Sequence, residues 1–183
     1  MYYILAAIAI VAVITVFLYN GLVRARQMAE EAWSGIDVQL KRRADLIPNL
    51  IETVKGYATH EKSTLEEIVE LRNKAQAVPT GDVAARGVAE GMLSQALGRV
   101  MAIAEAYPDL KASRNFADLQ QSLDGIEGEI QMARRYYNGS ARDLNIKVES
   151  FPSNLLAGPF GFQKKTFFEI DNPADRAVPT VKF

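Results

Sequence analysis

The side chains that could perform catalysis or bind a metal are few and isolated in this sequence. The chain of 183 residues has one histidine and no cysteine. His60-Glu61 lacks the second histidine, four residues on, that a zinc-binding helix of this kind requires. Cysteine nucleophiles, disulfides, thiolate zinc sites and multi-histidine sites within one chain are therefore excluded. We expect His60 to lie at the surface or at a helix end, and we predict no catalytic residue, no metal site and no cofactor.

The remaining polar candidates favour structural roles. Tyr136 and Tyr137 are expected to pack and to form hydrogen bonds. Lys41-Arg42-Arg43 could meet anionic lipid headgroups, but the third of these residues occupies a position in an apolar helical seam. A buried and paired arginine that fixes helix register is therefore the expected role. We assign three candidate structural buried polar residues: Arg43, Asp45 and Asn49.

A cluster of aromatic residues lies near the C-terminus. Five of the eight phenylalanines fall within residues 151–168, where glycines and a proline separate them and prevent one regular amphipathic helix. The cluster could fold back as a cap on the helices, contact a neighbouring subunit, or touch the membrane surface. The candidate interface residues are Phe160, Phe162, Phe167 and Phe168.

The elements that position these residues begin with an uncharged stretch. All 21 Lys and Arg and all 22 Asp and Glu residues lie after Val23. A helix needs about 20 apolar residues to cross the hydrocarbon core, and tyrosines or phenylalanines lie at both ends of this stretch, as in aromatic belts. The run has no basic residue before it and no clean cleavage site after it, so a retained anchor is favoured over a signal peptide.

Cations flank only one side of this stretch. Arg24 and Arg26 follow it directly, whereas only the α-amino group precedes it. The positive-inside rule then predicts a single-pass membrane protein with its N-terminus outside and its C-terminal domain in the cytoplasm. The formal net charge of −1 gives no support for nucleic-acid binding.

Two later stretches repeat apolar residues at steps of three and four, which predicts long helices with buried seams. The first seam has Arg43 in one of its positions and comprises Trp33, Ile36, Leu40, Ile47, Leu50, Val54 and Tyr57. The second comprises Phe116, Leu119, Leu123, Ile126, Ile130, Ala133, Tyr137 and Leu144. No stretch shows sustained strand alternation, so the predicted fold class is all-α, an antiparallel bundle preceded by one N-terminal transmembrane helix.

Turn and cap residues divide these helices. Breaks are predicted at Pro79-Thr80-Gly81-Asp82, with Asp82 as N-cap, and at Tyr107-Pro108-Asp109. Pro48 should remove one backbone hydrogen bond and kink the first helix. A capping box beginning at Ser63 or Thr64 favours a break near residues 59–63 and hence four helices, at about 24–58, 64–78, 83–106 and 109–150; without the break there are three. The predicted organisation is an anchor (1–23), a helical bundle (24–150), a Phe-rich segment (151–170) and an extended tail (171–183).

Several segments carry a family resemblance. They include Tyr19-Asn20-Gly21-Leu22-Val23-Arg24, Arg42-Arg43-Ala44-Asp45-Leu46-Ile47-Pro48-Asn49-Leu50, Tyr107-Pro108-Asp109-Leu110 and Phe151-Pro152-Ser153-Asn154. Over residues 19 to about 169 the sequence resembles the LemA family of bacterial membrane proteins. The resemblance implies one N-terminal span, an outside N-terminus and a cytoplasmic helical bundle, and it supplies no catalytic residues.

Together these features predict a membrane-anchored, non-enzymatic helical scaffold. We expect the lipid bilayer to hold residues 1–23, and we expect self-association into a homo-oligomer and contacts with other membrane proteins at the inner face. The alternative is a regulatory or sensory module that binds a partner protein through its aromatic C-terminal segment or its basic surface.

Overall fold

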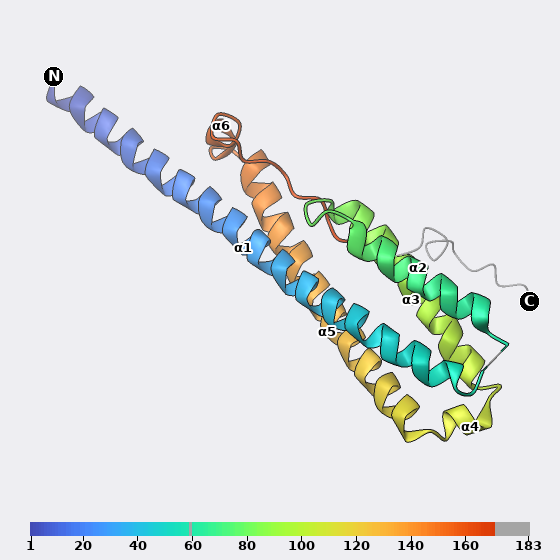
Figure 1. The fold of residues 1–183 in the computed structure, drawn as a ribbon. Coiled ribbons are helices and arrows are strands. Elements are labelled where there is room, and N and C mark those ends of the chain that lie inside the picture. Colours follow the sequence, from blue (N-terminus) through green and yellow to red (C-terminus); the bar gives the residue numbers. More distant parts are fainter. Residues whose placement is uncertain (59, 171–183) are drawn as a thin grey trace, which may run out of the picture. The chain divides into compact units, whose positions relative to one another are not determined.

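The computed structural model describes residues 1–58 and 60–170, and all the regular structure in them is helical. The predicted tail at 171–183 lies outside the described residues. The helices are α1 (Tyr2–Lys55), α2 (Lys62–Ala77), α3 (Val83–Ala104), α4 (Pro108–Lys111), α5 (Arg114–Glu149) and α6 (Asn154–Ala157) (Figure 1). The predicted all-α fold class is confirmed. The chain divides into a first unit, Met1–Ile36 with Met132–Phe167, and a second unit, Asp37–Gln131 with the residues from Phe168 on.

The predicted helix breaks agree with the observed ones. α1 ends at Lys55 and α2 begins at Lys62, so the break near residues 59–63 is present and the four long helices of the favoured alternative are formed. The Asp82 side chain accepts a hydrogen bond from the amide of Ala85 at 3.0 Å and so caps α3. The predicted capping box is wrong: α2 starts before Ser63, and the residue at its N-cap, Glu61, makes no side-chain capping hydrogen bond.

In the first unit, the N-terminal part of α1 and the C-terminal part of α5 run antiparallel. Lys147 Nζ donates to the carbonyl of Gly21 at 3.1 Å, and the Trp33 and Tyr137 rings lie with their centroids 5.3 Å apart. Three alanines of α1 are buried along this contact, at steps of four and three residues: Ala25, Ala29 and Ala32. Small side chains at these positions allow the two backbones to approach closely.

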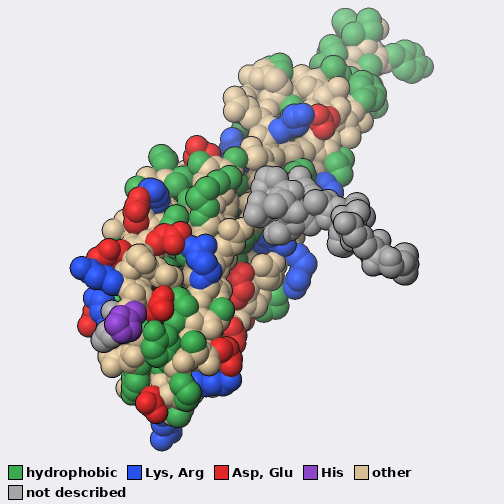
Figure 2. Space-filling view, turned by 90° about the vertical axis from the view of Figure 1, so that its right-hand side faces the viewer, with side chains coloured by type: hydrophobic (Ala, Val, Ile, Leu, Met, Phe, Trp, Pro, Cys, Tyr) green, Lys and Arg blue, Asp and Glu red, His purple; other side chains and the backbone are tan. Residues whose placement is uncertain are grey.

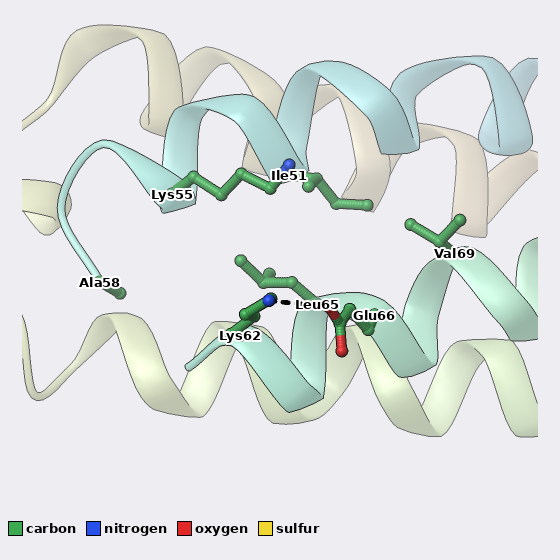
Figure 3. A pocket seen from close by; sticks show the side chains of 7 residues that line it. All are labelled: Ile51, Lys55, Ala58, Lys62, Leu65, Glu66 and Val69. Carbon is green, nitrogen blue, oxygen red and sulfur yellow. Dashed lines mark ion pairs between the residues drawn. The ribbon is translucent and has the colours of Figure 1, made fainter. Parts of the chain in front are cut away.

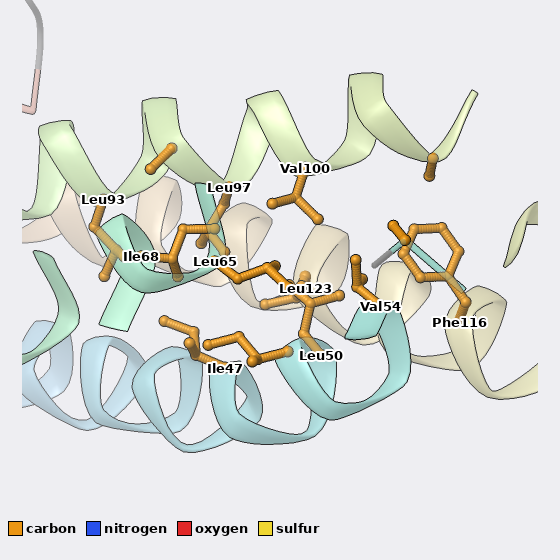
Figure 4. Packing of buried hydrophobic residues seen from close by; sticks show 14 of the residues in the cluster. Ile47, Leu50, Val54, Leu65, Ile68, Leu93, Leu97, Val100, Phe116 and Leu123 are labelled. Carbon is orange, nitrogen blue, oxygen red and sulfur yellow. The ribbon is translucent and has the colours of Figure 1, made fainter. Parts of the chain in front are cut away.

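In the second unit, α2, α3 and α4 pack with the adjoining parts of α1 and α5 around one apolar core (Figure 4). Both predicted seams supply it. Ile47, Leu50 and Val54 come from α1, whereas Phe116 and Leu123 come from α5. Tyr57 alone of the first seam is exposed, because α1 has ended two residues before it. In Figure 2, Lys and Arg side chains are interspersed with Asp and Glu side chains where the visible surface is charged, in keeping with the near-zero net charge.

Pro48 lies inside α1 without ending it. A proline has no N–H, so the carbonyl four residues earlier, that of Ala44, loses its helical hydrogen bond. Arg72 of α2 supplies the missing donor, since its Nε lies 2.7 Å from the Ala44 oxygen. The proline therefore creates an acceptor on α1 that ties α2 to it within the second unit.

Two glycines of α3, Gly87 and Gly91, form a seat for the main chain of residues 169–170. A Cβ added at Gly91 would lie 2.6 Å from the carbonyl oxygen of Ile170, and one added at Gly87 would overlap the carbonyl of Glu169. This G-x-x-x-G spacing places both glycines on one face of the helix. Only residues without a side chain allow the extended segment to lie against α3 this closely.

Gly91→Ala should therefore destabilise the protein, whereas Gly98→Ala should stabilise it. Gly98 lies in the same helix with nothing within 4 Å of an added Cβ, so alanine there gains about 0.5–1 kcal/mol of helix propensity. At Gly91 the overlap should cost about 1–3 kcal/mol. Thermal unfolding in detergent, followed by circular dichroism, gives both values. Equal stability of the two variants would show that residues 169–170 do not occupy the seat.

Candidate functional site

The Phe-rich segment forms two structures in turn. Residues 151–162, which we call the knob, make a compact turn around α6, and residues 163–170 are extended. The knob closes on itself through main-chain hydrogen bonds, including one from the Phe162 amide to the Ala157 carbonyl at 2.9 Å. Gly161 has a φ of 71°, which favours glycine, and it reverses the chain just before Phe162.

Ser153 caps the C-terminal end of α5, where the knob begins. The last carbonyls of a helix have no partners within the helix. Ser153 Oγ lies 2.6 Å from the carbonyl oxygen of Lys147 and 2.9 Å from that of Ser150, so a single hydroxyl covers this helix end. The Phe-Pro-Ser-Asn block noted in the sequence therefore terminates α5 and starts the knob.

Aromatic rings hold the knob against α1 within the first unit. The Tyr19 ring centroid lies 5.1 Å from that of Phe160 and 5.8 Å from that of Phe162, both in edge-to-face arrangements. Phe162 and Ala157 are buried with Leu22, and the guanidinium carbon of Arg26 lies 5.0 Å from the Phe162 ring centroid. The knob thus packs on the end of the uncharged stretch of α1, at Tyr19 and Leu22.

The four candidate interface residues fall into two pairs. Phe162 is buried in the first unit and Phe168 is buried in the second. Phe160 is 54% exposed and Phe167 is 41% exposed. Two of the rings are therefore buried, as the cap interpretation predicts, and the other two are at the surface, where a contact with a subunit or with the membrane stays a prediction.

Two polar residues of α5 hold the extended segment, and the sequence analysis missed one of them. Asn145 makes a pair of hydrogen bonds with the main chain of Lys165, from Nδ2 to its carbonyl at 2.9 Å and from its amide to Oδ1 at 2.7 Å. The Tyr137 hydroxyl donates to the carbonyl of Thr166 at 2.8 Å. Burial raises the pKa of Tyr137 above its ordinary value of 10.0, so this hydroxyl keeps its proton at neutral pH. An asparagine within a long helix, where its propensity is poor, was the available signal.

The second unit contains a buried ionic cluster centred on Arg43 of α1, whose exposed fraction is 1%. Its guanidinium donates to Glu90 Oε2 and Ser94 Oγ of α3, both at 2.6 Å, and to Glu127 Oε2 of α5 at 2.8 Å. Glu90 also accepts from Arg86 Nε at 2.9 Å. Arg86 in turn lies 3.4 Å from Asp37 Oδ1. The cluster thus joins three helices through alternating charges.

Asp45 and Asn49 do not belong to this cluster. Both are exposed, so their assignment as buried polar residues is wrong. Asp45 lies about 160° around the helix from Arg43, and Asn49 lies about 120° from it, so neither shares the face of Arg43. Proximity in the sequence therefore did not bring them to the seam. The true partners of Arg43 lie 47 to 84 residues further along the chain.

A surface groove lies at the turn between α1 and α2 (Figure 3). It has a volume of about 330 Å³ and its floor is mostly apolar, formed by Ile51, Ala58, Leu65 and Val69. Lys55, Lys62 and Glu66 also line it, and Lys62 pairs with Glu66 at 3.6 Å. The candidate residues of the sequence analysis do not line this groove.

The uncharged stretch lies at the start of α1, which is the only helix among the described residues long and apolar enough to cross a bilayer. Its most apolar window has a mean hydropathy of 2.4, and none of that window is buried against the rest of the protein. The protein therefore belongs to a class with one N-terminal apolar helix that could insert into a membrane, followed by an all-α domain. The model of the LemA family matches residues 32–183, and the chain belongs to this family.

Curated relatives extend the comparison over almost the whole chain. Magnetosome protein MamQ of Magnetospirillum gryphiswaldense is 25% identical over 96% of this chain and 74% of its own length. Magnetosome protein MamQ 2 of Paramagnetospirillum magneticum is 25% identical over 97% of this chain and 75% of its own length. Protein LemA of Metamycoplasma hominis is 27% identical over 82% of this chain and 68% of its own length.

Arg43→Met should destabilise the protein strongly, because it removes the cation between two carboxylates, one of them fully buried. Breaking a buried pair on one side costs about 3–5 kcal/mol. Arg42→Met is the matched control, since the Arg42 side chain is exposed and donates a hydrogen bond to Gln39 one turn earlier, at 3.0 Å, and surface changes stay within about 0.5 kcal/mol. Thermal unfolding of the two variants makes the comparison. If they unfold together, the cluster contributes no stability.

Proposed function

We propose that this protein is a membrane-anchored, non-enzymatic helical scaffold that self-associates and organises partner proteins at the inner face of the bacterial membrane. The continuity of α1 carries the proposal. One helix, α1 (Tyr2–Lys55), contains the apolar stretch and also contributes side chains to the apolar core of the second unit. An apolar stretch whose most apolar window contains no buried residue is stable in lipid and costly in water.

The proposed orientation rests on the charges that follow the apolar stretch. Arg24 and Arg26 lie within one turn of its end, whereas no side-chain charge precedes it. Cations next to a span favour the cytoplasmic side. The helices beyond Arg26 would then lie in the cytoplasm, which is compatible with a chain that has no cysteine.

Exposed apolar side chains support the proposed self-association. Val88 and Met92 lie one turn apart on α3, and both are more than half exposed. An apolar pair on one helix face can pack against a neighbouring copy. The MamQ relatives, at 25% identity, are named magnetosome proteins, and this name specifies no partner for the present chain.

A non-enzymatic role is favoured because the buried charges neutralise one another. Arg43, Arg86 and Glu90 are all engaged in mutual ion pairs of 2.6–2.9 Å. Catalytic acids and bases need a free lone pair or proton that points to a substrate. A cluster that satisfies its own charges acts instead as a fixed joint between helices.

A regulatory or sensory module is the second candidate, and the groove between α1 and α2 favours it. Its mostly apolar lining, together with the side chains of Lys55 and Lys62, suits a short amphipathic segment of a partner. The two functions separate by experiment, because a scaffold associates with copies of itself in the absence of any other protein.

The absence of cysteine makes the orientation directly testable. Tyr2→Cys and Ser63→Cys each introduce one thiol into a chain that has none, and both positions are exposed. In intact spheroplasts, a membrane-impermeant maleimide should label the cysteine at position 2 and should label the one at position 63 only after lysis. Labelling of position 63 alone in intact spheroplasts would reverse the proposed orientation.

Self-association should be detectable through the exposed face of α3. Met92→Cys is expected to give crosslinked dimers or larger products when native membranes are treated with a bis-maleimide. Lys74→Cys, on a polar face of α2 where the native lysine pairs with Glu70 at 2.6 Å, is the control and should crosslink far less. A strict monomer in detergent, together with the lack of crosslinks from either position, would rule out the scaffold.

A further inference from the structure

The knob displays three large apolar side chains to the surroundings. Phe151 is 79% exposed, Leu155 is 62% exposed and Phe160 is 54% exposed. They lie within ten residues of sequence, on a turn whose one other ring, that of Phe162, is buried against α1. Several large exposed apolar side chains on one short segment indicate a contact with a partner or with a membrane.

The position of the knob along α1 favours the membrane. Its contacts are with Tyr19 and Leu22, in the last apolar turns before the first charge at Arg24. The 22 residues from Tyr2 to Val23 rise about 33 Å as a helix, close to the ~30 Å of the hydrocarbon core. If α1 spans the bilayer over this stretch, a group beside Tyr19 lies at the boundary between acyl chains and headgroups.

Figure 1 shows the same arrangement, with the α6 segment beyond the end of α5 and beside α1 on the side of its N-terminal stretch. The end of α5 is fixed at that level, because Lys147 Nζ reaches the Gly21 carbonyl at 3.1 Å. The residues after Ser150 therefore continue toward the apolar stretch. The knob, which contains Phe151 and Leu155, accordingly lies beyond the last turn of α5, on the side of the apolar stretch.

Cations surround the base of the knob. Arg24 and Lys147 line a shallow cavity between α1 and α5, Arg26 lies against the Phe162 ring, and Lys164 pairs with Glu149 at 2.7 Å. Long basic side chains at such a boundary place their alkyl stems on apolar surface and their charges among lipid phosphates. Apolar groups on one side and cations on the other match the layering of a bilayer surface.

We propose that the knob is a second membrane contact, in which Phe151, Leu155 and Phe160 insert into the headgroup boundary of the leaflet that α1 leaves at Arg24. The occupant of this surface is lipid and not a second copy of the chain. Interfacial elements bury their apolar face about 5–10 Å into this boundary. The inference rests on the proposed anchoring by α1, and it adds that the protein is held at two points.

Fluorescence quenching by lipid tests this inference in the full-length chain. Trp33 is the only tryptophan, so a Trp33→Phe background allows one indole to be placed at will. Phe151→Trp reports on the knob and Phe17→Trp reports on the apolar stretch. Phe167→Trp is the matched control, because this exposed ring follows Thr166, which is bonded to Tyr137 at the level of Trp33 and so away from the boundary. Circular dichroism verifies that each variant is folded.

The variants are reconstituted at low protein density into phosphatidylethanolamine–phosphatidylglycerol vesicles that carry lipids brominated near the headgroup end of the acyl chains. We expect loss of emission for Phe17→Trp and Phe151→Trp, and unchanged emission for Phe167→Trp. Quenching of Phe17→Trp without quenching of Phe151→Trp overturns the proposal, whether acrylamide then shows the indole in water or shielded by a neighbouring copy. Unquenched Phe17→Trp overturns the anchoring by α1 itself, and so separates the two failures.

Discussion

The second unit depends on the neutralisation of one buried guanidinium. Arg43 is 1% exposed, and an uncompensated charge at that depth costs several kcal/mol. Its partners must therefore approach from other helices, and Glu90 and Ser94 of α3 and Glu127 of α5 do so. These bonds determine which faces of α1, α3 and α5 meet, and the apolar seams then pack in the register that the charges define.

The periodic and local features of the fold could be predicted from the sequence, because they depend on residues close together in the chain. The seams from Ile36 to Val54 and from Phe116 to Leu144 appear as spacing, and Asp82 and Pro108 mark helix starts. Asp45 and Asn49 show the limit of this reasoning. Nothing local indicates that Arg43 pairs with α3 and α5, since that choice depends on which helices are neighbours in space.

The contacts of the Phe-rich segment were less predictable, because side chains of α5 bind the main chain of this segment and not its side chains. Asn145 recognises the amide and carbonyl of Lys165, and Tyr137 recognises the carbonyl of Thr166. Such bonds leave no pattern in the residue types of the segment they hold. The same holds for Arg72, whose partner on α1 exists only because Pro48 lacks an N–H. Composition indicated an aromatic cluster, but its division into buried and exposed rings follows from these polar contacts.

The seat at Gly87 and Gly91 has a consequence for how the chain can vary. The groups that approach these glycines most closely are the carbonyls of residues 169 and 170, which every amino acid possesses. The contact therefore depends mainly on the path of the backbone at these two residues, although Ile170 Cγ2 also lies 3.7 Å from the position of a Cβ added at Gly91. A side chain added on α3 would collide with a main chain that every sequence shares, so variation at Gly87 and Gly91 should be more restricted than variation at position 170.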